Sequence, residues 1–212
     1  AGTSSGDGAD VFTGFENYTL SGNADIINLD VVHNGSIING GTGIDTASYA
    51  NVATALTVTV ANGNTSATVS DGTNSNTLQS IEKIIGGDGN DTFIVSNVSG
   101  INTLDGDGGN NTLQLSGNVD LSSVTVLNFQ NLEISNGDTL TVNAVDLSGK
   151  TMNITMLGTG SLIIVSDGSS HDFSNISFTK ETGTVTLDVN INKDISNSNI
   201  NNIIDRFDVA NG

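Results

Sequence analysis

GGDGNDTFI, at residues 86–94, is the stretch that decides the expected fold. It fills every fixed position of the repeat template G-G-x-G-x-D-x-U-x, in which U is a large apolar residue. Its glycines favour a tight turn, because glycine reaches positive φ at little cost. Asp91, at the sixth position, adds a carboxylate to that turn, and Phe93 at U begins a β-prone run. One nine-residue unit therefore encodes a turn, a carboxylate and a core residue.

Five further segments follow the same template to different degrees. Residues 40–48 (GGTGIDTAS) deviate only at U, which is Ala47, and residues 5–13 (SGDGADVFT) lack only the first glycine. The degenerate copies are residues 21–27, 71–78 and 106–113, the last with Asn111 in place of aspartate. The same interval of 20 residues separates Asp25 from Asp45, Asp71 from Asp91 and Asp91 from Asn111. Recurrence at this interval predicts an all-β chain folded as a parallel β-roll or β-helix-like solenoid.

Calcium is the cation that this pattern suits best. It takes about six to eight oxygen ligands, and a glycine-rich turn directs main-chain carbonyls at one point while an aspartate adds a carboxylate. Two turns on successive coils would complete the ligand shell, so we expect Ca²⁺ as the cofactor. The residues expected in these calcium-binding turns are Gly6, Asp7, Gly8, Asp10, Asp25, Gly40, Gly41, Thr42, Gly43, Asp45, Gly86, Gly87, Asp88, Gly89, Asp91, Asp105, Asp107 and Gly109.

The repeat pattern fades after about residue 120, whereas the strand pattern continues. Alternation of apolar and polar residues, with Gly, Asn and Asp between the runs, predicts strands at 123–129, 131–134, 139–145, 152–156, 161–165, 176–179 and 184–191. We therefore expect a calcium-binding solenoid over residues 1–118 and a β-rich structural section over residues 119–212. The second section is either a further β-solenoid or a sandwich, and residues 200–207 are expected to form a short helix that caps it.

Composition narrows the possible functions. The chain of 212 residues carries 23 acidic and 5 basic side chains, for a formal net charge of −18, so nucleic acid and anionic lipid surfaces are improbable partners. It has no cysteine, which excludes disulfides and Cys-ligated metals. No apolar run reaches the length of a membrane-spanning helix, and no signal peptide is visible at Ala1. We expect a piece of a larger protein, or one exported through a signal elsewhere.

Catalytic chemistry is poorly represented, and we expect no enzyme. No G-x-S-x-G or H-E-x-x-H motif occurs, and no Gly-Lys-Ser/Thr follows the glycine turns. Residues 105–116 do not form an EF-hand loop, since Asn110 and Ser116 replace its glycine and glutamate. We expect His33 and His171 to be exposed loop residues. The expected core anchors are Phe12, Phe93, Phe129, Met152 and Met156.

These motifs resemble the RTX repeat family, the β-roll proteins exported by type I secretion. Residues 40–60 (GGTGIDTASYANVATALTVTV) resemble its habit of following a calcium turn with a tyrosine-containing segment and a Val/Thr strand. Residues 80–91 (SIEKIIGGDGND) resemble its I-E-x-I-x-G lead-in, and residues 14–25 (GFENYTLSGNAD) are a looser version. The resemblance covers roughly residues 6–115. It implies calcium binding, export and a location outside the cell or on the bacterial surface.

The expected function is that of a non-catalytic, calcium-dependent structural module, with an S-layer lattice protein as the leading interpretation. Its partners would then be calcium ions and other copies of the chain. One alternative is a calcium-dependent adhesin that holds a cell-surface glycan. That interpretation needs an exposed aromatic beside an aspartate cluster, and Tyr49 is the candidate. The other alternative is a secretion and folding module attached to a secreted enzyme.

Overall fold

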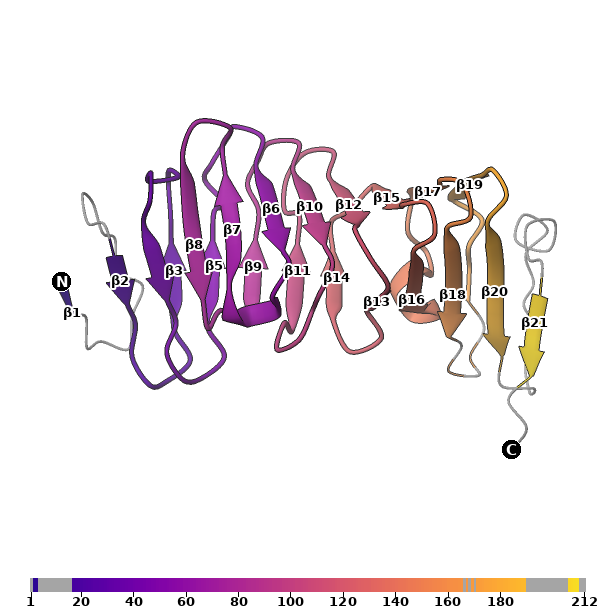
Figure 1. The fold of residues 1–212 in the computed structure, drawn as a ribbon, viewed down its shortest axis with the longest axis horizontal. Coiled ribbons are helices and arrows are strands. Elements are labelled where there is room, and N and C mark those ends of the chain that lie inside the picture. Colours follow the sequence, from indigo (N-terminus) through magenta and orange to yellow (C-terminus); the bar gives the residue numbers. More distant parts are fainter. Residues whose placement is uncertain are drawn as a thin grey trace. The chain divides into compact units, whose positions relative to one another are not determined.

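The computed structural model describes residues 2–3, 17–165, 167, 169, 171–189 and 206–209, and side chains within 17–165, 167, 169 and 171–184. The described secondary structure is almost entirely β, and nearly all its strand pairs are parallel. The chain divides into two compact units, the first formed by residues 1–113 and 124–129 and the second by residues 114–123 and 130–212. The fold is a parallel β-solenoid, as the repeats predict (Figure 1).

Unit 1 coils between two sheets. The strands of the first sheet, in spatial order, are β1 (Gly2–Thr3), β2 (Asn17–Thr19), β4 (Ile37–Asn39), β8 (Ser75–Gln79), β7 (Ala67–Ser70), β6 (Thr57–Val60), β10 (Thr92–Val95) and β12 (Thr112–Leu115), the last of which begins in this unit. Those of the second sheet are β3 (Ile26–Asn28), β5 (Thr46–Ser48), β9 (Lys83–Ile85), β11 (Thr103–Asp105) and β14 (Thr125–Leu127). The pairing of β3 with β5 joins residues 20 apart, which confirms the repeat interval as one coil.

An insertion interrupts the regular coiling of unit 1. The β6–β7 and β7–β8 pairs are antiparallel, and Figure 1 shows β7 running against its two neighbours. Three strands therefore lie between β4 and β10 in the first sheet, whereas β5 and β9 are direct neighbours in the second. The expectation that residues 71–78 form a degenerate repeat is wrong. Asp71 instead closes the β7–β8 hairpin, where its Oδ1 accepts hydrogen bonds from Thr73 N (2.8 Å) and Asn74 N (2.7 Å).

The strands of unit 2 also pair in parallel, so this unit is a solenoid and not a sandwich. One sheet holds β15 (Asn131–Ile134), β17 (Met152–Met156) and β19 (Ile176–Lys180). The other holds β13 (Val119–Asp120), β16 (Thr139–Asn143), β18 (Ser161–Val165), β20 (Thr184–Val189) and β21 (Arg206–Val209). A short helix, α1 (Ala144–Leu147), ends the strand expected to run to residue 145. Of the expected helix at 200–207, Arg206 and Phe207 lie in β21 instead, and the rest falls outside the described residues.

The core follows the alternation of side chains along the strands. The apolar residues at U, which are Ile27, Ala47, Phe93 and Leu113, are all buried. Phe93 meets Phe129 edge to face, with ring centroids 5.0 Å apart. Met152 and Met156 are buried as expected, whereas Phe12 lies outside the described residues.

None of the helices among the described residues has the length and hydrophobicity that a transmembrane span requires.

Tyr49 occupies the interior beside the insertion. Its side chain is fully buried, and its hydroxyl donates to Asn76 Oδ1 of β8 (3.1 Å). Asn76 Nδ2 in turn donates to the His33 carbonyl (2.6 Å). Asn76, expected at a weak calcium turn, is therefore part of the packing around Tyr49. The exposed aromatic that the adhesin interpretation requires is not provided by this tyrosine.

Candidate metal-binding turns

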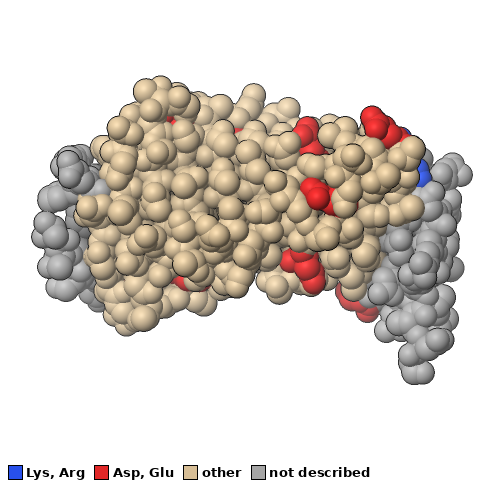
Figure 2. Space-filling view, viewed as in Figure 1, with Lys and Arg blue, Asp and Glu red and all other residues tan. Residues whose placement is uncertain are grey.

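The predicted turns of unit 1 lie in two rows, not one. The first row joins the first sheet to the second and contains the turns that end at Asp25 and Asp45. The second row joins the second sheet back to the first and contains the turns that end at Asp91 and Asn111. Because each coil passes both edges, residues that match one template can lie on opposite sides of the solenoid. The acidic residues thus form two groups. On the face drawn in Figure 2, acidic side chains appear singly and most of the described surface is uncharged.

Asp45 is the central residue of the first row. Its side chain is fully buried, and its Oδ1 accepts a hydrogen bond from Asp25 N on the preceding coil (2.8 Å). Asp45 N donates to Glu82 Oε2 on the following coil (2.8 Å). Each carboxylate therefore accepts the N–H of its counterpart one coil earlier. Among the described residues, no hydrogen-bond donor reaches Asp45 Oδ2, although this atom is buried. A buried, unsatisfied carboxylate oxygen is costly unless a proton or a cation meets it.

Asp91 holds the corresponding position in the second row. Its Oδ1 accepts from Leu56 N (2.7 Å) and its Oδ2 from Gly87 N (2.7 Å). Asp91 N donates to Asn111 Oδ1 on the next coil (2.8 Å). The template aspartates therefore connect neighbouring coils even before any metal is considered.

The first glycine of each template leaves room for an oxygen from the next coil. A Cβ on Gly40 would lie 2.6 Å from Asp45 Oδ2 and would overlap the Ser80 carbonyl oxygen. A Cβ on Gly86 would lie 2.8 Å from the Gly106 carbonyl oxygen and would overlap Asp91 Oδ2. At both glycines a carboxylate oxygen and a carbonyl oxygen converge on the same small space. At Gly40 the carboxylate oxygen has no donor among the described residues, whereas at Gly86 it accepts from Gly87 N.

Asn111 shows what fills the same space without a metal. A Cβ on Gly106 would lie 2.6 Å from both Asn111 Nδ2 and the Asn128 carbonyl oxygen. Here the side-chain atom is a donor, and it bonds the carbonyl oxygens of Asn128 (3.0 Å) and Gly108 (2.8 Å). The amide thus supplies the hydrogens that Asp45 Oδ2 lacks among the described residues, whereas Asp91 Oδ2 accepts one hydrogen bond, from Gly87 N. The three equivalent positions differ by one atom of the side chain, which is a hydrogen-bond acceptor in aspartate and a donor in asparagine.

The pKa values of three aspartates in these turns are raised above the ordinary value. Burial raises the pKa of Asp45, and the charges of Glu82 and Asp25 raise it further, against the hydrogen bond from Asp25. Burial likewise raises the pKa of Asp91, partly offset by its bonds from Gly87 and Leu56. The pKa of Asp107 is raised by burial and by Asp105 and Asp88 nearby. A bound cation would oppose each of these effects, because it favours the ionised carboxylate.

The remaining predicted glycines of the turns allow the coils to approach closely, and the remaining predicted polar residues accept or donate hydrogen bonds or are exposed. The glycines whose added Cβ would meet main-chain atoms of a neighbouring coil are Gly41, Gly43, Gly87, Gly89 and Gly109. Thr42 Oγ1 donates to the Gly22 carbonyl (3.2 Å), and Asp25 Oδ2 accepts from Ser21 N and Oγ (2.8 and 2.7 Å). Asp88 is exposed. Asp105 Oδ1 accepts from Asp107 N (2.9 Å) and Asn128 Nδ2 (2.7 Å).

Four predicted residues, Gly6, Asp7, Gly8 and Asp10, lie outside the described residues. Two other residues were missed by the template, Ser80 and Glu82: Glu82 is the glutamate of the I-E-x-I-x-G lead-in before the strongest repeat, and Ser80 directly precedes that motif. No group of three or more acidic, histidine or cysteine side chains able to hold a metal occurs within the described part of the chain. Main-chain carbonyls would therefore have to supply many of the ligands, as calcium accepts and zinc does not.

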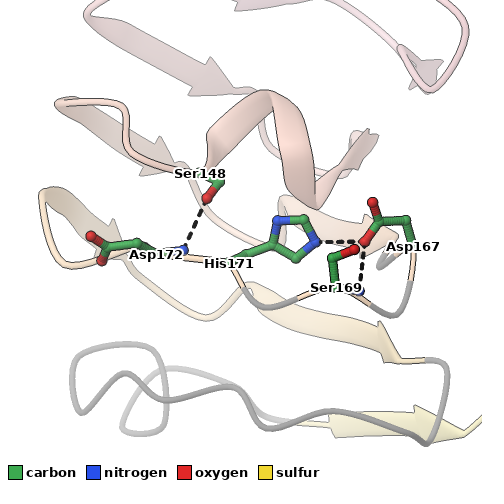
Figure 3. A network of polar contacts seen from close by, with 5 residues as sticks. All are labelled: Ser148, Asp167, Ser169, His171 and Asp172. Carbon is green, nitrogen blue, oxygen red and sulfur yellow. Dashed lines mark hydrogen bonds and ion pairs between the residues drawn. The ribbon is translucent and has the colours of Figure 1, made fainter.

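A separate polar network lies in unit 2 (Figure 3). His171 Nε2 and Asp167 Oδ1 are 2.9 Å apart, and Ser169 N donates to the same carboxylate oxygen (2.8 Å). Asp172 N donates to Ser148 Oγ (2.9 Å). The expectation of an exposed His171 is wrong, since only 6% of its side chain is accessible and its ring lies beside Phe173. These contacts link Asp167, Ser169 and His171 to one another and Asp172 to Ser148.

No family model, no curated protein and no solved structure matches the chain.

Proposed function

We propose that this chain is a calcium-dependent structural module of a secreted or cell-surface bacterial protein, related to the RTX repeat proteins. The single observation that carries the proposal is the buried Oδ2 of Asp45, which has no donor among the described residues and converges with the Ser80 carbonyl oxygen on Gly40. Oxygen facing oxygen in a buried turn is the arrangement that a hard cation stabilises.

Calcium fits these turns better than other common cations. The available ligands are carboxylate and carbonyl oxygens, which exclude the soft and nitrogen-ligated metals. Magnesium demands a nearly ideal octahedral shell and keeps several waters, whereas calcium accepts irregular sets of main-chain carbonyls. Asp45 and the Ser80 carbonyl would hold one ion, and Asp91 with the Gly106 carbonyl would hold another. Extracellular calcium modules typically bind at about 10⁻⁴–10⁻³ M.

Calcium would serve the structure and not a reaction. The acidic side chains that give the chain its net charge of −18 repel one another within a compact solenoid, and bound cations reduce that repulsion. Binding to the folded state alone would stabilise it by mass action, so the module would remain loose in a calcium-poor cytosol and fold after export. An S-layer lattice is the assembly that we propose, with contacts between copies of the chain. Lattice formation by the purified protein, followed by electron microscopy with and without calcium, tests this part separately.

Native mass spectrometry combined with thermal unfolding tests the calcium proposal. The wild-type chain should bind calcium and melt at a higher temperature with calcium than with a chelator. Asp45→Asn should bind one ion fewer. Asp120→Asn is the matched control, because Asp120 is exposed and its Oδ1 accepts a local hydrogen bond from Ser122 N. Equal melting temperatures with and without calcium would contradict the proposal.

A further inference from the structure

The coil that follows Asp45 differs from the other coils of unit 1 that the structure describes. Between β5 and β9 the chain makes the antiparallel β6–β7–β8 meander, so Asp45 and Glu82 are 37 residues apart although they occupy successive coils. The ladder from Asp25 to Asp45 to Glu82 is therefore continued across the insertion. A glutamate, with a longer side chain, stands where the two preceding coils place Asp25 and Asp45.

Ser80 turns its carbonyl toward Gly40 through an uncommon backbone conformation. It is one of three residues other than glycine with positive φ among those described, at 49°. Its N–H donates to the Asn64 carbonyl (2.6 Å), which fixes this conformation at the end of the meander. Non-glycine residues with positive φ store strain and occur often at functional sites. Here the consequence is that Ser80 O and Asp45 Oδ2 converge on Gly40.

Glu82 is held in place by the same segment. Its side chain is 9% exposed, its Oε2 accepts from Asp45 N (2.8 Å), and its Oε1 accepts from Asn64 Nδ2 (2.7 Å). Asn64 belongs to the short 3-10 helix η1 (Gly63–Thr65), which lies between β6 and β7, and its own N–H donates to the Ser99 carbonyl (2.9 Å). The Glu82 carboxylate is thus kept next to Asp45, where its charge helps to raise the pKa of that residue.

We infer that the cation site at Gly40 is completed by the insertion: Ser80 supplies a carbonyl ligand, Glu82 a second carboxylate, and Asn64 positions Glu82. The inference rests on the proposed calcium function and names the ligands of one site and the segment of chain that supplies them. Cation binding at Asp45 then requires the meander to be docked, and a docked meander is stabilised by the cation. The insertion becomes a calcium-dependent element within an otherwise regular solenoid.

Tyr49 provides a natural probe of that docking. It is fully buried and bonded to Asn76 of β8, and the chain has two tyrosines and no tryptophan. Release of the meander would expose this ring and break its hydrogen bond. The near-ultraviolet circular dichroism of tyrosine, to which the buried Tyr18 also contributes, therefore responds to release of the meander, and hydrogen exchange of residues 67–79 reports on its central strand, β7, and one outer strand, β8.

The experiment compares wild type, Asp45→Asn and Glu82→Gln by calcium titration and by hydrogen exchange with and without calcium. Glu133→Gln in β15 of unit 2 is the matched control for loss of one glutamate charge. Calcium should slow exchange of residues 67–79 in wild type and in Glu133→Gln. Glu82→Gln should weaken binding at this site about ten-fold or more and lose the calcium-dependent protection. Asn64→Ala should reduce both effects while keeping the carboxylate.

The outcomes separate this inference from the proposed function. Calcium binding by none of the proteins would overturn both. Binding that is lost in Asp45→Asn but unchanged in Glu82→Gln would overturn the inference alone. If Glu82→Gln lowers stability equally with and without calcium, Glu82 is only a packing residue and the inference is also wrong. If hydrogen exchange of residues 67–79 in the wild type is the same with and without calcium, cation binding and docking of the meander are not coupled, and the inference is overturned by the wild type alone.

Discussion

Replacing Asn111 by aspartate should convert a metal-independent turn into one that needs calcium. In the wild-type chain, Asn111 Nδ2 donates to the carbonyl oxygens of Gly108 and Asn128. Aspartate keeps the Oδ1 that accepts from Asp91 N but places an acceptor against those two carbonyls. The substituted turn would then have the arrangement of Asp45, whose Oδ2 has no donor among the described residues.

The size of the effect follows from the two lost bonds. Asn111 is fully buried, and leaving a buried acceptor unsatisfied costs about 1–3 kcal/mol. Without calcium, we therefore expect the free energy of unfolding to fall by about 3 kcal/mol. Calcium at about 100 times its Kd would return about 2.7 kcal/mol, because it binds only the folded state. The variant should lose most of its stability deficit when calcium is added.

Urea unfolding with and without calcium measures this change, and native mass spectrometry counts the ions. Asn111→Asp should bind one calcium ion more than wild type. Asn110→Asp is the control, since Asn110 is exposed and the change in charge is the same one residue away. If Asn111→Asp is destabilised as much with calcium as without it, or binds no additional ion, then a carboxylate oxygen placed against these two carbonyl oxygens does not create a calcium site.

Two further predictions concern the same turns. In the calcium-free protein, the pKa values of Asp45, Asp91 and Asp107 are raised, so acidification from neutral pH toward the ordinary value of 3.8 should stabilise the fold. Calcium needs the ionised carboxylates, so the gain in Tm that it gives should shrink over that range; a constant gain in thermal scans would contradict this. Gly40→Ala should cost about 2 kcal/mol or more, since its Cβ would overlap the Ser80 carbonyl oxygen. Gly22→Ala, which meets only the Thr42 hydroxyl at 3.2 Å, should cost much less in urea unfolding.

The fold was largely predictable because its signals are local. A glycine-rich turn followed by an alternating strand is encoded within nine residues, and the interval between Asp25 and Asp45 gave the length of a coil. The strands at 131–134, 152–156 and 161–165 were predicted to the residue. The helix at Ala144–Leu147 was missed, because four residues are too few to show a helical period.

The candidate site was predictable only in part. The template identifies Asp45 and Asp91, because their position in the repeat is fixed. It cannot show that the interval from Asp71 to Asp91 is a coincidence, since a hairpin turn uses the same residue types as a repeat turn. It also gives no reason to choose Glu82, which reaches Asp45 only through the meander.

By itself, then, the sequence determined that the chain forms short parallel strands between glycine–aspartate turns, because turn chemistry and side-chain alternation act over a few residues. The tertiary structure decided which edge each turn occupies and which carbonyl oxygen faces each carboxylate. Those relations arise between coils: Ser80 faces Asp45, and Asn128 faces Asn111, only after the coils have stacked. Whether a buried oxygen has a hydrogen-bond donor depends on that contact, and the proposed cation at Asp45 therefore follows from the tertiary structure and not from the template.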